Sequence, residues 1–473
     1  MKQPSLFNSS RRGFLRSMVG GSLLYPSLVS ELMASESAAA PVGLLDPLAP
    51  HAPHFAPKAK RVIFLYMSGG VSHVDSWDPK PKLFADAGKT ISVDEFQGRK
   101  GDFKMYAKRP QWDFARHGRC GTEVSALFPH MAECVDDLCV IRSMKSDHTN
   151  HYEATLGIHT GSFTFARPSI GSWVSYGLGT ENRNLPSFIV IAPKSPYAGG
   201  QVWAGDFLPG AHQGTLVVPG AEPVANIQRR VATSRLQELE LGALGKMNRR
   251  HLASRADDPL LSARIKSFET AFGMQMEMPD VFDLSRESDA TLELYGLKRG
   301  STQGFAWQCL VARRLAERGV RFVELIDVGS SDNWDAHGDM LTHTPLAKNV
   351  DQAIAGLLKD LKLRGMLEDT LVVWTTEFGR TPFNATADSK GREHHHWVFS
   401  SWLAGAGVKP GSVYGESDDY GINVGKNAVH VHDFHATILH LMGLDHERLT
   451  YRHTGRDYRL TDVAGEVVQG SLA

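Results

Sequence analysis

The chain has 473 residues, of which 42% are hydrophobic and 22% are charged, and its formal net charge is −1. This is the composition of a globular protein with a large core in one or two domains. The near-neutral charge balance gives no indication of a nucleic acid or an anionic membrane as a partner.

The first 40 residues are predicted to be a twin-arginine export signal. Arg11 and Arg12 precede Phe14 and a mildly apolar stretch at 18–32, which is the pattern of such signals; an amphipathic N-terminal helix is the alternative. The apolar stretch is too short and too interrupted for a stable membrane span. We therefore expect a periplasmic or other extracytoplasmic protein without an integral membrane span in the mature chain, and a linker at the proline- and alanine-rich residues 41–58.

The first strand is predicted at residues 61–66, a short apolar run without alternation that indicates burial on both faces. Gly69 and Gly70 then permit a tight turn at the strand end. Asp75 follows this turn and is the first candidate for a metal ligand. Asp78, which precedes a proline, is either a second candidate or a residue that shapes the turn.

A second strand is predicted at 138–141, followed by a small helix from residue 152 to 160. Thr149 carries a hydroxyl just before this helix. Such a hydroxyl is well placed to attack an ester anion, because the free N–H groups at a helix N-terminus stabilise negative charge. The alternative is that Thr149 only caps the helix.

Further strands are predicted at 185–192 and 320–326, and helices at about 225–300 and at 303–318. We interpret the helices at 225–300 as an insertion in a domain that spans residues 59–473. Asp335 and His337, two residues apart on the loop after the strand at 320–326, could both face one metal ion.

The segment from 344 to 396 contains the densest group of candidate site residues. Thr344 and Pro345 indicate a helix start and Gly365 its end, and residues 370–374 form another buried strand. Glu377 and Arg380 follow that strand, at the sheet edge where ligands bind in open α/β folds, and three consecutive histidines come later: His394, His395 and His396. Carboxylate and imidazole suit Zn, Mn, Fe or Ni better than Ca or Mg, and an arginine fork suits an anion. The alternative is a Glu377–Arg380 pair with solvated histidines.

Near the C-terminus, residues 398–408 are predicted to form a strand and a turn. A helix follows, with Asp433 as its N-cap and Gly443 as its end.

Four segments resemble motifs of sulfatases, in the same order along the chain. HYEATLGIHTG at 151–161 resembles the end of their nucleophile motif, and LEDTLVVWTTEFG at 367–379 resembles a strand that ends in metal ligands. SWLAGAGVKPGSVYGE at 401–416 and VHDFHATILHLMGLD at 431–445 resemble the strand and helix that follow. Together with the export signal, MSGGVSHVDSWDPKP at 67–81, WDAHGD at 334–339 and EFGRTP at 377–382, they identify the chain as a member of an exported family of unknown function in the alkaline phosphatase/sulfatase superfamily.

The resemblance implies an α/β fold, an alkaline-phosphatase-like three-layer sandwich with a mostly parallel sheet between helices on both faces. Residue by residue, it implies metal ligands at Asp335, His337, Glu377 and one of His394, His395 and His396, with Asp75 in place of the usual first-strand aspartate. The chain departs from sulfatases at three places: Met67 to Gly69 replace two adjacent aspartates, Phe378 replaces a histidine ligand, and His151 occupies the position of the modified cysteine. No formylglycine cofactor is therefore expected.

The expected function is metal-dependent hydrolysis of a phosphate or sulfate ester, with two divalent ions (Zn, Mn or Ca) and a small anionic ester or a sulfated or phosphorylated glycan as substrate. Arg380 would hold the anion. The attacking group is metal-bound water, Thr149 or His151. The alternative, which the three departures support, is a sulfatase-like protein that binds anionic glycans or other extracytoplasmic anions without turnover.

Overall fold

The computed structural model describes residues 46–96, 99–229, 233–253, 255 and 259–473. The predicted export signal and the start of the predicted linker lie outside these residues. The chain divides into two units, one formed by 46–228 together with 266–473, and another that contains the described residues between 229 and 265. None of the described helices is both long and apolar enough to span a membrane.

The larger unit is built on one mixed, mostly parallel sheet. Strand β14 runs antiparallel to its neighbours β10 and β6, and the other pairings in this sheet are parallel. The strand order is β15 (Ser412–Tyr414), β6 (Leu138–Lys145), β14 (Phe399–Ala404), β10 (Thr370–Thr375), β1 (Arg61–Met67), β9 (Phe322–Asp327), β7 (Phe188–Ile191) and β8 (Thr215–Val217), and β18 (Val429–His430) also pairs with β6. The mostly parallel α/β sheet expected from the sequence is confirmed.

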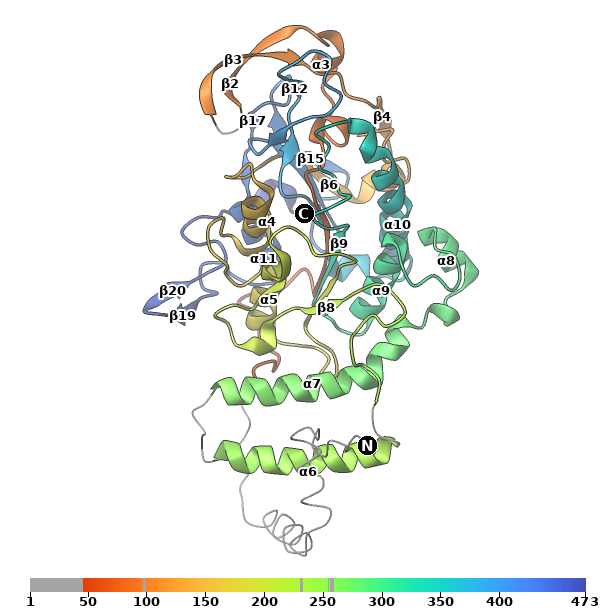
Figure 1. Ribbon diagram of the computed structural model, residues 1–473, viewed down its shortest axis with the longest axis vertical. Helices are drawn as coiled ribbons and strands as arrows, with labels where there is room; N and C mark the ends of the chain where they lie inside the picture. Colours follow the sequence, from red (N-terminus) through yellow and green to blue (C-terminus); the bar gives the residue numbers. More distant parts are fainter. Residues whose placement is uncertain (1–45, 97–98, 230–232, 254, 256–258) are drawn as a thin grey trace, which may run out of the picture. The chain divides into compact units, whose positions relative to one another are not determined.

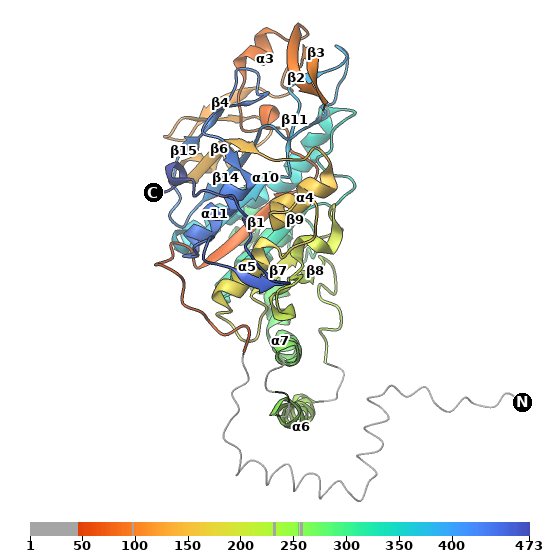
Figure 2. The ribbon, with the colours of Figure 1, turned by 90° about the vertical axis from the view of Figure 1, so that its left-hand side faces the viewer.

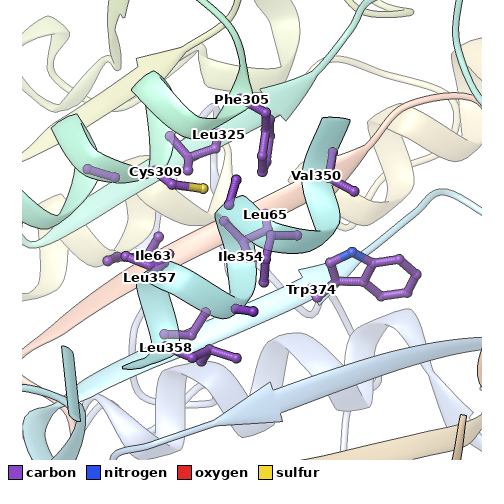
Figure 3. Packing of buried hydrophobic residues seen from close by; sticks show 14 of the residues in the cluster. Ile63, Leu65, Phe305, Cys309, Leu325, Val350, Ile354, Leu357, Leu358 and Trp374 are labelled. Atoms are coloured by element: carbon purple, nitrogen blue, oxygen red, sulfur yellow. The ribbon is translucent and has the colours of Figure 1, made fainter. Parts of the chain in front are cut away.

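The central strand β1 has apolar side chains on both faces because both faces are covered. Val62 and Phe64 belong to one hydrophobic cluster, and Ile63 and Leu65 to the other. Figure 3 shows Ile63 and Leu65 packed against the helix that carries Ile354. Burying one such side chain stabilises the fold by about 1.5–3 kcal/mol, which explains why the strand lacks alternating polar residues.

Helices form a layer on each face of the sheet (Figure 1). The first cluster includes side chains of α4 (His151–Thr160), α5 (Ile170–Leu178) and α11 (Val431–Leu441). The second cluster includes side chains of α8 (Asp289–Tyr295), α9 (Phe305–Glu317) and α10 (His343–Leu363). The three layers thus follow from the two apolar faces of the buried strands.

Helix ends differ from the sequence expectations in three places. Helix α10 begins at His343, one residue before the predicted start, and Gly365, with φ of 67°, follows its end as expected. Helix α4 is capped by Asn150, whose side chain accepts from the Tyr152 N–H, so the cap expected at Thr149 lies one residue further on. Asp433 is not the N-cap of α11 but the N3 residue of a capping box whose N-cap is His430.

Shorter elements lie outside the main sheet (Figure 2). A short ladder pairs β11 (Gly379–Arg380) with β13 (His394–His395), and a three-stranded sheet contains β2 (Thr90–Phe96), β3 (Arg99–Ala107) and β12 (Phe383–Asn384). The range predicted as a helical insertion is occupied by α6 (Ser234–Ala253), α7 (Pro259–Phe282) and α8. The remaining two-stranded pairs are β4 (Phe114–His117) with β5 (Thr122–Ser125), β16 (Glu416–Ser417) with β17 (Val424–Lys426), and β19 (Tyr451–His453) with β20 (Arg456–Tyr458).

Candidate metal centre

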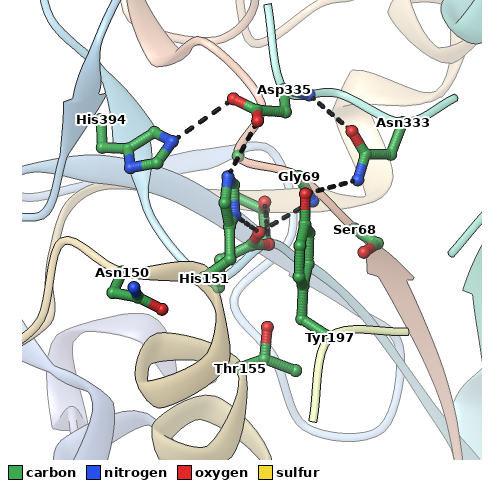
Figure 4. A network of polar contacts seen from close by, with 12 residues as sticks. Ser68, Gly69, Asn150, His151, Thr155, Tyr197, Asn333, Asp335 and His394 are labelled. Atoms are coloured by element: carbon green, nitrogen blue, oxygen red, sulfur yellow. Dashed lines mark hydrogen bonds and ion pairs between the residues drawn. The ribbon is translucent and has the colours of Figure 1, made fainter. Parts of the chain in front are cut away.

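Residues that are far apart in the sequence meet at the carboxyl edge of the sheet. Gly69 follows β1, Glu377 follows β10, Asp335 lies on the loop after β9, and His151 opens α4 after β6. His394 joins them because β13 pairs with β11, directly after β10. Figure 4 shows this group, in which His151 and His394 both point toward Asp335.

Three imidazole rings direct their Nε2 atoms at the carboxylate of Asp335. The Nε2 atoms of His151 and His394 each lie 3.3 Å from an Asp335 oxygen, and that of His337 lies 3.0 Å away. One ligand atom each from His151, Asp335 and His394 falls within 4.8 Å of the others, a spacing that suits a shared metal ion. The Nε2 atoms of His337 and His394 are only 2.9 Å apart.

Each of these rings has an acceptor behind it, at Nδ1. His151 Nδ1 lies 2.7 Å from Glu377 Oε1, His394 Nδ1 lies 2.7 Å from the Thr149 carbonyl oxygen, and His337 Nδ1 lies 2.9 Å from Glu393 Oε2. An imidazole that donates from Nδ1 keeps a free lone pair on Nε2, and such support is typical of metal-binding histidines.

The front of the cluster fits a cation. His151 Nε2 is buried, and apart from the 3.3 Å contact with Asp335 it has no polar partner among the described residues. Two Nε2 lone pairs facing each other, as at His337 and His394, repel unless a proton or a metal ion lies between them. Three imidazole nitrogens and one carboxylate form a donor set for Zn, Mn, Fe or Ni.

Without an ion, protons and charges balance the cluster. Burial alone would raise the pKa of Asp335, but hydrogen bonds from His151, His337 and His394 hold it well below its usual range. The hydrogen bond with Asp335 raises the pKa of His337. Burial opposes protonation of His151, and its contacts with Asp335 and Glu377 outweigh that effect and raise its pKa. Burial lowers the pKa of His394. A metal cation would take the place of these protons.

Glu377 lies behind His151, on the Nδ1 side of its ring, and both carboxylate oxygens of Glu377 accept hydrogen bonds. Its side chain is fully buried. Oε1 accepts from the N–H of Gly69 at 2.8 Å and from His151, and Oε2 accepts from the hydroxyl of Tyr66 at 2.9 Å and that of Thr376 at 3.1 Å. Burial would raise the pKa of Glu377, but His151 and these donors lower it. The structure therefore gives Glu377 a role behind a ligand, where the sequence predicted a ligand.

Gly69 explains the glycine pair after β1. Its φ is 113°, and an added Cβ would lie 2.6 Å from the Trp334 nitrogen and 2.7 Å from the Asp335 nitrogen. Only glycine lets the backbone approach the metal-site loop this closely while donating to Glu377.

Arg380 does not extend into the site as the predicted anion fork. Its side chain is fully buried and donates to the carbonyls of Gly69, Gly70 and Arg392 and, at 2.6 Å, to Asp335. Four of its five N–H donors are thus bound within the protein. We correct the sequence expectation: Arg380 holds Asp335 in place.

Two predicted ligands have other partners. Asp75 is fully buried and forms an ion pair with Arg392 at 2.7 Å, and it also accepts from the Gln111 N–H. His395 points away from His394, as neighbours on a strand do, and its Nε2 lies 2.7 Å from the Ile422 carbonyl oxygen. Neither residue belongs to the cluster around Asp335, and these two expectations are corrected.

The two predicted nucleophiles have different positions. His151, expected as a possible nucleophile, is one of the three converging imidazoles. Thr149 contributes its backbone carbonyl, as the acceptor for His394.

Two aromatic side chains, Tyr197 and Phe378, contact the imidazole rings of the cluster. Tyr197 stacks on His151 with ring centroids 4.2 Å apart and an interplanar angle of 6°. Phe378 contacts both His151 and His394, with centroids 4.8 and 4.7 Å away. Burial raises the pKa of Tyr197, so its hydroxyl stays protonated. Nothing in the local sequence around Tyr197 marks it as a site residue, whereas Phe378 is adjacent to Glu377.

Fold and site together define an α/β protein with a histidine-rich candidate metal centre at the carboxyl edge of its sheet. The sequence profile of the family described as "Protein of unknown function (DUF1501)" matches residues 59–472, and the chain belongs to this family. No curated protein matches the chain.

Several solved structures are similar to this chain at low identity. They include a lipoteichoic acid synthase, LtaP, from Listeria monocytogenes (9% identity, 88% of this chain and 79% of that chain, TM-score 0.34). An alkaline phosphatase from the Antarctic bacterium TAB5 (13%, 77% and 96%, 0.31) and the PsFucS1 sulfatase from Pseudoalteromonas sp. (12%, 82% and 68%, 0.34) are also similar. Similarity at this level identifies neither the activity nor the ligand of this chain.

Proposed function

We propose that the protein is an exported, metal-dependent hydrolase of phosphate or sulfate esters. The observation that carries the proposal is the convergence of three imidazole Nε2 atoms on Asp335, each ring supported at Nδ1. A carboxylate–imidazole cluster of this kind, at the sheet edge where α/β folds bind ligands, is suited to a catalytic ion.

Each residue of the cluster would have a separate role in metal binding or hydrolysis. His151, His337, His394 and Asp335 would hold one divalent ion, and Arg380 would keep Asp335 in position. When bound, such an ion polarises ester oxygens and lowers the pKa of a coordinated water. Phe378 and Tyr197 would limit the access of bulk water to this side of the cluster. Thr149 remains a candidate nucleophile, at the N-terminal end of α4.

The first test is metal uptake. Protein purified after native export should contain a divalent ion, measured by elemental mass spectrometry. Asp335→Asn and His394→Ala should lower metal affinity at least about tenfold, the usual effect of disturbing such a site. Asp332→Asn is the matched control, since Asp332 lies on the same loop, is 83% exposed and pairs with Lys194 instead. Equal metal content in all four proteins would contradict the proposal.

The second test is turnover. Phosphate and sulfate monoesters and diesters should be offered to protein loaded with Zn, Mn or Ca. Hydrolysis by the wild type that is lost in Asp335→Asn would support the proposed hydrolase activity. Binding of phosphate or sulfate without hydrolysis of any ester would favour the alternative, a protein that recognises anionic glycans or other anions outside the cytoplasm.

A further inference from the structure

Tyr197 places a phenolic hydroxyl beside the candidate metal centre. Its ring lies flat against His151, and Figure 4 shows the two side chains projecting side by side, with the hydroxyl of Tyr197 and the Asp335-bound nitrogen of His151 at the same end. The hydroxyl therefore lies on the same side of the cluster as the His151 nitrogen that faces Asp335.

The hydroxyl of Tyr197 is free to donate its proton to a ligand. Asn333 Nδ2 donates to the Gly329 carbonyl at 3.0 Å, and Asn333 Oδ1 accepts from the Asp335 N–H at 3.1 Å, so the orientation of the amide is fixed. Asn333 Nδ2 also donates to the Tyr197 oxygen at 3.1 Å. Tyr197 thus acts as an acceptor toward Asn333, and no described residue accepts its own proton.

The loop around Tyr197 is fixed in position. Ala198 and Gly199, the next two residues, both have left-handed backbones, with φ of 63° and 55°. The Ser330 N–H donates to the Ser195 carbonyl at 3.0 Å, which joins this loop to the one that carries Asn333. A non-glycine residue in this conformation is strained, and such residues are often found at ligand sites.

We propose that Tyr197 donates a hydrogen bond to an oxygen of a tetrahedral oxyanion, a phosphate or sulfate group, bound in front of Asp335 and the three histidines. This rests on the proposed function, and it assigns to Tyr197 the anion contact that the sequence had suggested for Arg380. Four of the five N–H donors of Arg380 are bound within the protein, whereas no described residue accepts the proton of the Tyr197 hydroxyl.

Two substitutions separate the hydroxyl from the ring. Tyr197→Phe keeps the stacking on His151 and removes only the oxygen. Tyr197→Leu removes both. Tyr152→Phe is the matched control, because Tyr152 is 42% exposed and its hydroxyl binds Gln201.

The experiment is calorimetric titration of the metal-loaded proteins with inorganic phosphate and with sulfate, after a separate metal titration of each. We expect Tyr197→Phe to bind the preferred anion about tenfold more weakly, the effect of one lost hydrogen bond to a charged group. Its metal affinity should stay within about twofold of wild type, since the ring is kept, while Tyr197→Leu loses affinity for both metal and anion. Tyr152→Phe should match wild type.

Each other result has a clear meaning. Metal uptake with equal anion affinities in wild type and Tyr197→Phe overturns the role of Tyr197 but not the proposed function. Failure of the metal-loaded wild type to bind either anion also overturns the proposed role of Tyr197. If anion binding weakens in Tyr197→Phe but no ester is hydrolysed, the proposed role of Tyr197 is supported and the proposed hydrolase activity is excluded. Failure of the wild type to take up any metal overturns both.

Discussion

Glu377 is the residue on which the geometry of the candidate metal centre depends. It is fully buried and receives hydrogen bonds from a backbone N–H, two hydroxyls and one imidazole. A buried carboxylate with this many donors stays ionised. Its charge in turn fixes the tautomer of His151 and makes Nε2 of that ring a stronger metal ligand.

We predict that Glu377→Gln weakens metal binding about 10- to 100-fold. It should also lower the free energy of unfolding by about 1–3 kcal/mol, because the amide nitrogen would face a donor in a buried site. Metal titration and urea unfolding of the metal-free protein measure the two effects. Glu393→Gln is the control, because Glu393 supports His337 in the same way but is 31% exposed, and its effect on stability should be small. If both variants unfold at the wild-type urea concentration, the buried network does not stabilise the fold.

The types of residue at the site could be predicted from the sequence more reliably than their roles. Asp335, His337 and His394 follow predicted strands and do converge. The sequence does not reveal whether a carboxylate faces an ion or another protein group, and burial decides this. Asp75 and Glu377 carry the same chemical group, yet one pairs with Arg392 and the other supports His151.

The N-terminus of α4 is a second case, now at the scale of an element, in which the sequence predicts the residue types but not the role of each residue. The helix itself could be predicted, but the sequence reads His148-Thr149-Asn150, and both Thr149 and Asn150 are good N-caps. The structure selects Asn150, whose side chain accepts from the Tyr152 N–H at 2.9 Å. Apolar strands such as β1 and β10 could be predicted because burial on two faces leaves a clear pattern. The two-residue strands β11 and β13 leave none, although they decide which of the three histidines faces Asp335.

We predict that Asn150→Ala costs about 1 kcal/mol of stability, the typical value for a lost N-cap. Thr149→Ala should change stability by less than about 0.5 kcal/mol, as for other substitutions away from caps and core. Thr149→Ala should also bind metal normally, since only its carbonyl contacts His394. Urea unfolding of both variants provides the comparison. A larger loss in Thr149→Ala would show that its side chain has a structural role.

At the scale of the whole molecule, the sheet order could not be predicted from the order of strands in the chain. β1, the first strand, lies in the middle of the sheet between β10 and β9. The sequence could indicate a parallel sheet from its buried apolar strands, but adjacency is decided by side-chain packing between elements that are hundreds of residues apart. The antiparallel direction of β14 is likewise absent from its apolar pattern.

The predicted export route concerns the whole chain and has its own test. We expect the double variant with Arg11→Lys and Arg12→Lys to accumulate as precursor in the cytoplasm, because the arginine pair is what the twin-arginine route recognises. Cell fractionation followed by immunoblotting measures this, with Lys2→Arg as a matched control outside the pair. Normal export of the double variant would exclude this route.

The hydrogen bonds of Glu377 to Tyr66 and Gly69 have a consequence for folding. They join parts of the chain 311 and 308 residues apart, and loops of such length close slowly and late. The candidate metal centre therefore forms only after β1 has paired with the last third of the sequence. An ion bound there would favour the finished chain over every shorter or partly folded one. Its capture would mark the completion of folding and hold α4, β13 and the loop after β9 together from then on.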